Sequence, residues 1–577
     1  MFLCERGLPI RGDDEVTSSV HNGNYLGVME LLSKYDTFLA AHLHKHANKG
    51  SGNVNYLSST VYNELINVLG GKVLSAIVAE VRRAKYYSIS VDSTPDVSHT
   101  DQLCLTIRYV LPEGPVERFL TFMPLLNHTG KEIADVVLDF LQTNKIPICD
   151  CRSQSYDNAI NMSGKYRGIQ AHLKSRCEFA EFVPCMAHSL NLIGMCAAEC
   201  CTAAVTLFGI VQRLYVYLVK STYRWRKHRD ALKHMPVVKC LSDTRWSARA
   251  DAVEALANGF QQNITVLDDL AMDEHRNAEA KNEASAILKE LEKLETVILL
   301  VTWQEILKRF NATSQQLQKP GLDLNTAVKL LESLTEFVQD LRERFDDFEH
   351  IAIDKCGHSE YEDDRRRVRR RKRHHDEVDS ADDTQLPPRE RFRTTSYIPI
   401  IDLLTTSLDR LKAYGTLRQR FSFFSEITTM QTDKLRDSAA DLVKSYPNDL
   451  EPSLVSEIVH FQAFLKTMQT EDSEKLSETT MFSTIHNYDM VAAFANVEIA
   501  LRVYLSMFVT NCTGERSFSK LKRIKNYLRS TIGQDRLASL AILSAEHELF
   551  RRVSTRETIE DFARIKARKN LKDSVGF

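Results

Sequence analysis

Three carboxylates in this chain stand at positions from which they could share a metal site. Asp92 ends a short β-rich run, Asp157 ends another, and Glu515 lies at the start of a predicted helix over residues 515–528. Strand ends at one edge of a sheet converge, and a late helix packed on that sheet can bring a third carboxylate there. Three oxygen donors suit Mg²⁺ or Mn²⁺ rather than zinc. Two such ions can activate a water and stabilise the leaving oxygen of a phosphodiester.

The same residues also have an ordinary structural interpretation. An aspartate at a strand end is commonly a turn residue or a cap. Composition alone does not single out Glu515 among the many glutamates. The three positions taken together favour a metal site more than any one of them does, but both interpretations stay open on the residues alone.

A second candidate is the pair Cys185 and His188, which are three residues apart. On a helix such a pair shares one face and could bind a metal. A structural zinc site needs four ligands, and no convincing second pair accompanies this one. A positioning role near DNA, or plain packing, is the better interpretation.

A third candidate is Arg245 with Trp246, in a chain that has only three tryptophans. A tryptophan beside an arginine could stack on an unpaired base while the guanidinium holds a phosphate. Core packing of Trp246 is the alternative, and on the residues alone it is favoured. The sequence has no Walker-type phosphate loop and no GxSxG elbow, so neither of those catalytic classes is indicated.

The elements that must position these residues follow an α/β order. Turn formers separate short β-rich runs, and apolar periodicity marks one helix among them. The predicted strands cover residues 86–91, 103–110, 116–123, 146–156 and 179–183, with the helix over 131–141. This is the order of an RNase H-like core, in which Asp92 and Asp157 end the first and fourth strands.

Helical periodicity dominates the rest of the chain and suggests its domain organisation. An N-terminal helical region is expected over residues 1–84, with a break at Gly70-Gly71, and the first part of the core over 85–253. A helical insertion domain is expected over 254–490, because its apolar stripes at steps of three and four are typical of bundle cores. The end of the core is expected over 491–577. The predicted fold class is therefore α/β, an RNase H-like mixed sheet interrupted by a large all-helical insertion.

A disordered charged linker is expected at about residues 354–393, since this segment cannot bury enough apolar surface to fold alone. Within it, every residue from 365 to 375 except Val368 is basic or histidine. One interpretation is a solvated, charge-balanced loop. The other is a nuclear-import signal or a contact to the DNA backbone.

Composition limits the remaining possibilities. The 577 residues carry a net charge of −2, so any DNA contact must come from local basic patches. A hydrophobic share of 43% with 26% charged residues is typical of a soluble globular protein. The 12 cysteines lack the spacing of a disulfide framework, which favours reduced thiols in an intracellular protein. We expect no signal peptide and no membrane association.

Several segments, in the same order and spacing, resemble the hAT-superfamily transposases. They are Tyr156-Asp157-Asn158-Ala159, Asn161-Met162-Ser163-Gly164, Cys185 with His188, Thr244-Arg245-Trp246 and Glu515-Arg516-Ser517-Phe518-Ser519. Upstream, Gly23-Asn24-Tyr25 and Val91-Asp92-Ser93-Thr94 are similar to the branch that contains zinc finger MYM-type protein 1-like chains. The likeness runs from about residue 8 to residue 550, and it is specific because independent motifs keep their order.

The resemblance implies a site and a partner. By motif position, the catalytic and metal-binding residues fall on Asp92, Asp157 and Glu515, with two Mg²⁺ or Mn²⁺ ions as cofactor. Roles at the DNA are implied for Trp246, Arg245 and His188, with Trp246 supporting a flipped base. A C-terminal region is implied to form a homodimer or higher oligomer, and we expect its contacts at Leu528, Leu537, Leu540 and Leu543. DNA is the implied partner, and a nuclear location follows from it.

Two functions remain open at this point. The first is a Mg²⁺-dependent DNA transposase that hydrolyses phosphodiesters and transfers strands, and the three carboxylates favour it. The second is a domesticated, non-enzymatic DNA- or chromatin-binding regulatory protein that keeps the fold for dimerisation. The charged linker favours the second, as does the lack of a Cys/His zinc-finger pattern in the first 80 residues.

Overall fold

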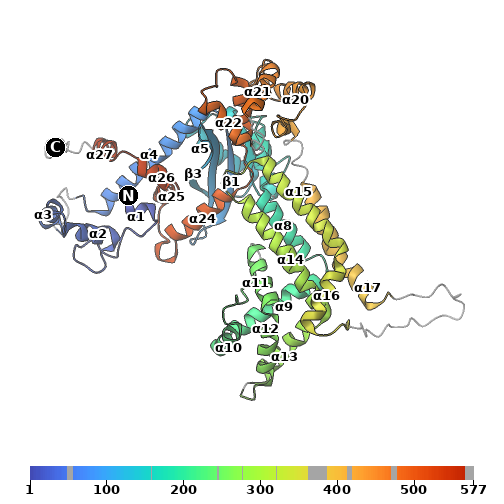
Figure 1. The fold of residues 1–577 in the computed structure, drawn as a ribbon. Helices are drawn as coiled ribbons and strands as arrows, with labels where there is room; N and C mark the ends of the chain where they lie inside the picture. Colours follow the sequence, from blue (N-terminus) through green and yellow to red (C-terminus); the bar gives the residue numbers. More distant parts are fainter. Residues whose placement is uncertain are drawn as a thin grey trace. The chain divides into compact units, whose positions relative to one another are not determined.

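The structure is a computed structural model, and it divides the chain into two compact units (Figure 1). It describes residues 1–48, 56–157, 159–242, 246–275, 277–319, 321–361, 386–411, 419–468 and 477–565. The first unit comprises Met1–Met186, Pro320–Asn325 and Thr416–Phe577, and the second comprises Ala187–Lys319 and Thr326–Gly415. The first unit is therefore built from both ends of the chain, whereas the second comes from its middle.

Among the described residues, five strands form one mixed sheet in the first unit. They are β1 (Tyr87–Pro95), β2 (Asp101–Leu111), β3 (Gly114–Leu125), β4 (Cys151–Ser155) and β5 (Glu181–Phe182). Their order in the sheet is β3-β2-β1-β4-β5. The first three strands are antiparallel neighbours, while β4 runs parallel to β1 and β5 parallel to β4. Helix α5 (Gly130–Thr143) connects β3 to the parallel part. The predicted RNase H-like α/β fold is confirmed.

Strand β1 shows how the sequence separates the two faces of this sheet. Tyr87, Ile89 and Val91 point to one face, and two serines and Asp92 alternate with them on the other. The apolar residues and both serines are fully buried. Since serine is small, the elements on the polar face can approach the sheet closely.

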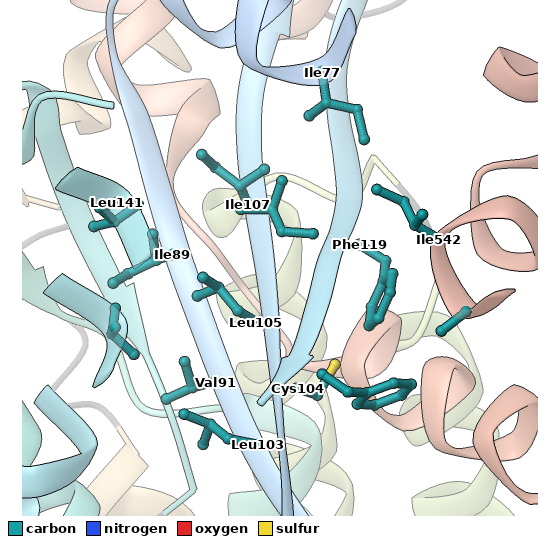
Figure 2. Close-up of a cluster of buried hydrophobic side chains, with 14 of the residues drawn as sticks. Ile77, Ile89, Val91, Leu103, Cys104, Leu105, Ile107, Phe119, Leu141 and Ile542 are labelled. Atoms are coloured by element: carbon teal, nitrogen blue, oxygen red, sulfur yellow. The ribbon is translucent and has the colours of Figure 1, made fainter. Parts of the chain in front are cut away.

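The apolar face lies in the main hydrophobic core of the first unit. Helices α4 (Ser59–Ala84) and α5 supply side chains to the cluster drawn in Figure 2, which includes Ile77, Ile107 and Leu141. The C-terminal helix α25 (Gln534–Ala545) packs on α4 and β3 and adds Ile542 to the same cluster. Segments from both ends of the chain thus share one core.

Helix α4 runs unbroken through Gly70 and Gly71, so the predicted break there was wrong. A Cβ atom on Gly70 would lie 3.0 Å from Cβ of Ser539 in α25. The glycine therefore serves the close approach of two helices rather than the end of one.

The polar face of the sheet is covered by helices from the C-terminal part of the chain. Helices α23 (Ala495–Ser506) and α24 (Cys512–Ile524) both contact β1 and β2. Arg108 Nε in β2 donates a 3.0 Å hydrogen bond to the carbonyl of Leu505. The ring of Phe518 in α24 stacks on Phe122 of β3 at 5.8 Å between centroids. In Figure 1 the orange-red α24 accordingly lies beside the blue strands.

Further helices of the first unit surround this core. They are α1 (Phe2–Glu5), α2 (Gly23–Ser33), α3 (Thr37–His46), α6 (Ile160–Ser163), α7 (Ile169–Lys174), α20 (Thr432–Ser445), α21 (Leu454–Met468), α22 (Glu478–Asn487), α26 (His547–Arg552) and α27 (Thr555–Arg564).

The described part of the second unit is helical. Its helices are α8 (Met186–Ala198), α9 (Thr202–Val219), α10 (Thr222–Leu232), α11 (Trp246–Asn258), α12 (Phe260–Met272), α13 (Ala278–Leu291), α14 (Leu294–Leu317), α15 (Leu324–Asp340), α16 (Phe345–Cys356), α17 (Pro388–Phe392) and α18 (Ile398–Arg410). Helix α9 packs on α10, α13 and α14, and α11 packs on α14. These contacts explain why the helical unit begins at Ala187, upstream of the expected residue 254.

Helix α9 is the one helix in the described ranges that is long and apolar enough to cross a membrane by length and composition. Leu207, Leu214 and Leu218 of this helix are buried inside the second unit. Its apolar character therefore matches its role as a core helix of that unit.

Helices enter the expected charged linker from both sides. Helix α16 extends to Cys356, and α17 begins at Pro388. Arg389 of α17 holds Glu349 of α16 through an ion pair of 2.7 Å. The basic run over residues 365–373 lies outside the described residues.

Candidate active site

Strand register brings Asp92 and Asp157 to the same edge of the sheet. Strands β1 and β4 are parallel neighbours, and in their register Ser90 pairs with Ser155. Each aspartate lies two residues beyond this pair. Both therefore lie just beyond the last paired residues of adjacent parallel strands. Asp157 follows the end of β4, whereas β1 continues to Pro95, so the expectation that Asp92 ends its strand was wrong.

Asp92 and Asp157 each accept a local backbone hydrogen bond. The third carboxylate, Glu515, lies near the start of a helix. Asp92 Oδ1 accepts from the backbone N–H of Ser93 at 2.9 Å. Asp157 Oδ1 accepts from the backbone N–H of Ala159 at 3.1 Å, as in an Asx turn. Glu515 lies exposed in the first turn of α24, where the helix dipole favours negative charge.

The three carboxylates interact electrostatically. Burial, followed by the negative charges of Asp157 and Glu515, raises the pKa of Asp92 to about 7, and the hydrogen bond from Ser93 only partly opposes this. Like charges raise a carboxyl pKa in this way only at short range. Asp157 and Glu515, which the sequence singled out with Asp92, are therefore near enough to Asp92 to affect its pKa.

The carboxylate oxygens suit a hard divalent cation, but the described side chains do not surround a position that such an ion could occupy. In the described part of the chain, no three His, Cys, Asp or Glu side chains lie close enough together to hold a metal ion. The ligand type is nevertheless the one that Mg²⁺ and Mn²⁺ prefer. A cation would also remove the repulsion that disfavours ionised Asp92, because opposite charge favours the charged form.

One buried residue beside the carboxylates was missed by the sequence analysis. Asn511 directly precedes α24 and is 4% exposed, yet its side chain makes no cap hydrogen bond to that helix. Its Oδ1 lies 2.7 Å from Ser90 Oγ, and its Nδ2 donates to the carbonyl of Val91 at 3.3 Å. An asparagine before a helix suggests a cap, so only the tertiary structure reveals this contact to β1.

Cys185 contacts the same asparagine. Its Sγ accepts from the backbone N–H of Asn511 at 3.2 Å, and its own N–H donates to the carbonyl of Tyr156 at 3.0 Å. Cys185 is buried. Its position favours the packing and positioning interpretation of the Cys185–His188 motif.

Trp246 is a core residue of the second unit. It is 5% exposed and packs on Trp303 and Phe310, with ring centroids 5.9 Å and 6.2 Å away. A Cβ atom on Gly194 would lie 2.8 Å from its indole ring. The structure therefore agrees with the packing alternative for Trp246, and a buried indole offers no surface on which a base could stack.

The sequence also predicted that His188 and Arg245 contact DNA. His188 lies half-buried in α8 of the second unit. Arg245 lies outside the described residues.

The four leucines expected at a dimer interface fall into two groups. Leu537, Leu540 and Leu543 of α25 are at most 1% exposed, inside the core that α25 forms with α4 and β3. Leu528, in the short turn η6 (Tyr527–Arg529), is 78% exposed. Of these four leucines, only Leu528 has its side chain at the surface. The apolar side of α25 packs in the core of the first unit.

Two family models match the chain at the segments that carry the carboxylates. The model of the ZMYM1/FAM200, RNase-like domain matches residues 1–168, which include Asp92 and Asp157. The model of the hAT family C-terminal dimerisation region matches residues 489–549, which include Glu515. These matches show that the chain is similar, in these two segments, to hAT-type transposase-derived proteins. The segment that matches the dimerisation-region model also supplies α23 and α24, the helices on the polar face of the sheet.

Two curated relatives have low sequence identity to this chain. The "52 kDa repressor of the inhibitor of the protein kinase" of Homo sapiens is 20% identical over 521 residues, covering 88% of this chain and 68% of the relative. The mouse protein of the same name is 20% identical over 522 residues, with the same coverage.

Proposed function

We propose that this chain is a dimeric, DNA-binding, transposase-derived protein whose carboxylates bind Mg²⁺ or Mn²⁺ and cleave phosphodiester bonds. The observation that carries the proposal is the register of β1 and β4, which places Asp92 and Asp157 at neighbouring positions, with Glu515 near enough for its charge to contribute to the raised pKa of Asp92. In this proposal the three carboxylates, which come from distant parts of the chain, share one metal site, and their mutual repulsion has no structural benefit. Such repulsion is the ordinary cost of a site arranged for a cation.

Each carboxylate has a distinct role in this proposal. Asp92 and Asp157 stand on adjacent strands, so the sheet holds two ligands in fixed relative positions. Glu515, which lies in the first turn of α24, would supply the third ligand. The bound ions would activate water and stabilise the leaving oxygen.

A basic face on α24 supports the proposed contact with nucleic acid. Arg516 and Arg523 are seven residues apart, as are Glu515 and Lys522, so all four share one side of the helix. All four are exposed. Cations beside Glu515 would hold phosphates next to the carboxylates, in a chain whose overall charge gives no such attraction.

The location that this function needs is the nucleus. The basic run over residues 365–373 has the composition of an import signal. DNA in the nucleus, together with a second copy of this chain, is therefore the proposed partner set.

Nicking of supercoiled plasmid by the full chain in Mn²⁺ tests the proposal. We expect the wild type to nick, and Asp92→Asn, Asp157→Asn and Glu515→Gln each to lose nicking. The matched control is Asp135→Asn, which changes an exposed acid of α5 paired with Lys131. Equal nicking by wild type and Asp92→Asn would show that these carboxylates do not carry the activity.

The second candidate is a regulatory DNA-binding protein without catalysis. The observation that favours it is that the described side chains do not close a metal shell. A relative named as a repressor is consistent with it. DNA binding by the wild type without nicking, and unchanged in all three carboxylate variants, would support this candidate.

A further inference from the structure

One buried residue, Asn511, joins the backbone segments that carry all three carboxylates, through its side-chain amide and through its own backbone groups. The carbonyl that accepts from Asn511 Nδ2 belongs to Val91, the residue before Asp92. The backbone carbonyl of Asn511 accepts a 3.2 Å hydrogen bond from the N–H of Glu515. Asn511 thus holds the segment of Asp92 through its amide, and its backbone forms the first turn of the helix that carries Glu515.

The third segment is reached through Cys185. The N–H of Asn511 donates to Cys185 Sγ, and the N–H of Cys185 donates to the carbonyl of Tyr156, the residue before Asp157. A second route runs through Ser90, whose Oγ lies 2.7 Å from both Asn511 Oδ1 and the carbonyl of Ser155. Its one hydroxyl proton is shared between these two acceptors.

The space around Asn511 is closed, so its amide has few other positions. A Cβ atom on Gly514 would lie 2.7 Å from Asn511 Oδ1. Such a contact is shorter than van der Waals distance, and the amide is already held by Ser90 and Val91. A side chain at position 514 would therefore push the amide away from β1.

We infer that Asn511 is a positioning residue that sets the relative places of Asp92, Asp157 and Glu515 so that they can share a divalent cation. This inference rests on the proposed function. Asn511 touches no reacting atom, and it acts by fixing the strand ends and the start of α24. Residues that orient metal ligands in this way typically change metal affinity about 10–100-fold when replaced.

Binding of Mn²⁺ alone to the full chain, measured by loss of the free-ion EPR signal, tests the inference without any reaction. Mn²⁺ that binds to other carboxylates is corrected for by subtracting the binding measured with the Asp92→Asn variant. We expect Asn511→Ala to weaken the remaining site about tenfold or more. Gly514→Ala should weaken it similarly although it leaves Asn511 in place, and alanine itself suits a helix better than glycine.

A double variant, Asn511→Ala with Gly514→Ala, distinguishes a positioning role of Asn511 from a general loss of stability. If Gly514→Ala acts by displacing the Asn511 amide, it should add no further loss in the Asn511→Ala background. The matched control is Asn496→Ala. Asn496 is also buried, at 7% exposure, and its amide bonds to Ser453 and Glu457. Asn496→Ala should lower the thermal midpoint about as much as Asn511→Ala does, and it should leave the Mn²⁺ affinity unchanged.

The outcomes distinguish this inference from the proposed function. Wild-type Mn²⁺ affinity in Asn511→Ala, with Asp92→Asn impaired, would overturn the role of Asn511 and leave the metal site standing. Equal losses in Asn511→Ala and Asn496→Ala would show a merely structural role. Equal binding by wild type and Asp92→Asn would overturn both. Should Asn511→Ala fail to fold, Gly514→Ala gives the same decision.

Discussion

The ammonium group of Lys525 lies 2.6 Å from the carboxylate of Asp96, and both side chains are buried. Asp96 follows β1, whereas Lys525 follows α24, so the pair ties the strand of Asp92 to the helix of Glu515. Gln102 Nε2 also donates to Asp96, at 3.0 Å. Burial alone would raise the pKa of Asp96, but hydrogen bonds from Lys525, Ser98 and Gln102 outweigh it and lower the pKa to about 2.

Lys525→Met should destabilise the protein by about 3–5 kcal/mol at pH 7, because it leaves a buried carboxylate without its partner. The folded pKa of Asp96 is below its ordinary value of 3.8. Its ionised form therefore stabilises the fold above about pH 4, and this contribution is lost as the pH falls towards 2. Urea unfolding should show the difference between wild type and variant shrinking over that window. Lys131→Met, at an exposed pair with Asp135, should cost at most about 1 kcal/mol.

Leu528→Asp should weaken dimerisation with little change in the stability of the fold, because this side chain is at the surface. Leu537→Ala should instead cost about 2–5 kcal/mol of folding free energy, as buried leucines do. Light scattering over a concentration series measures the first effect, and urea unfolding measures the second. A fully dimeric Leu528→Asp protein would exclude this leucine from the interface.

Replacing Lys522 and Arg523 together by glutamine should weaken DNA binding and reduce the salt dependence of the binding constant. The slope of log K against log salt should fall by about 1 for each lost phosphate contact. Lys434→Gln with Arg436→Gln on α20 makes the same charge change at two exposed positions of the same unit. Identical slopes for the two double variants would rule out α24 as the DNA contact.

Asp92→Asn should raise the thermal midpoint in EDTA, since it removes one of three mutually repelling carboxylates. Added Mn²⁺ should stabilise the wild type more than the variant, because a ligand stabilises only the state that binds it. Differential scanning calorimetry with and without Mn²⁺ gives both comparisons. A lower midpoint for Asp92→Asn in EDTA would mean that the carboxylate serves the fold.

Alanines in place of the basic residues over 365–373 should reduce nuclear entry of a fluorescent fusion of the full chain. The physical basis is the density of positive charge in this run. A matched fusion with Lys434→Ala and Arg436→Ala should enter as the wild type does. Unchanged entry of the first fusion would assign nuclear import elsewhere.

The sequence predicted the sheet well because its strands carry local signals. Alternation in β1 and the turn formers around β2 and β3 depend on near neighbours, so they could be recognised without the fold. Strand order predicted that Asp92 and Asp157 lie on neighbouring strands, but β1 continues to Pro95 instead of ending at Asp92. Glu515 needed the family resemblance, since no local feature separates it from other glutamates.

The predictions that differed from the structure depend on what lies opposite a residue in space. Gly70 resembles a helix break until Ser539 is seen against it. The apolar stripe with Leu537 can equally be an interface or a core, and the position of α4 decides between them. The sequence position of Asn511 suggests a helix cap, whereas in the structure its amide donates to the carbonyl of Val91 in β1. Periodicity and spacing contain none of these long-range contacts.

The polar face of the sheet consists of segments made early in synthesis, whereas α23 and α24, which cover it, are made near the end. A chain released before residue 495 would expose the serines of β1 and would lack Glu515. Contacts between such distant segments also slow folding, because the long loop must close first. A truncated product would thus be an aggregation-prone protein without a metal site. The proposed capacity to cut DNA would arise only in the finished chain.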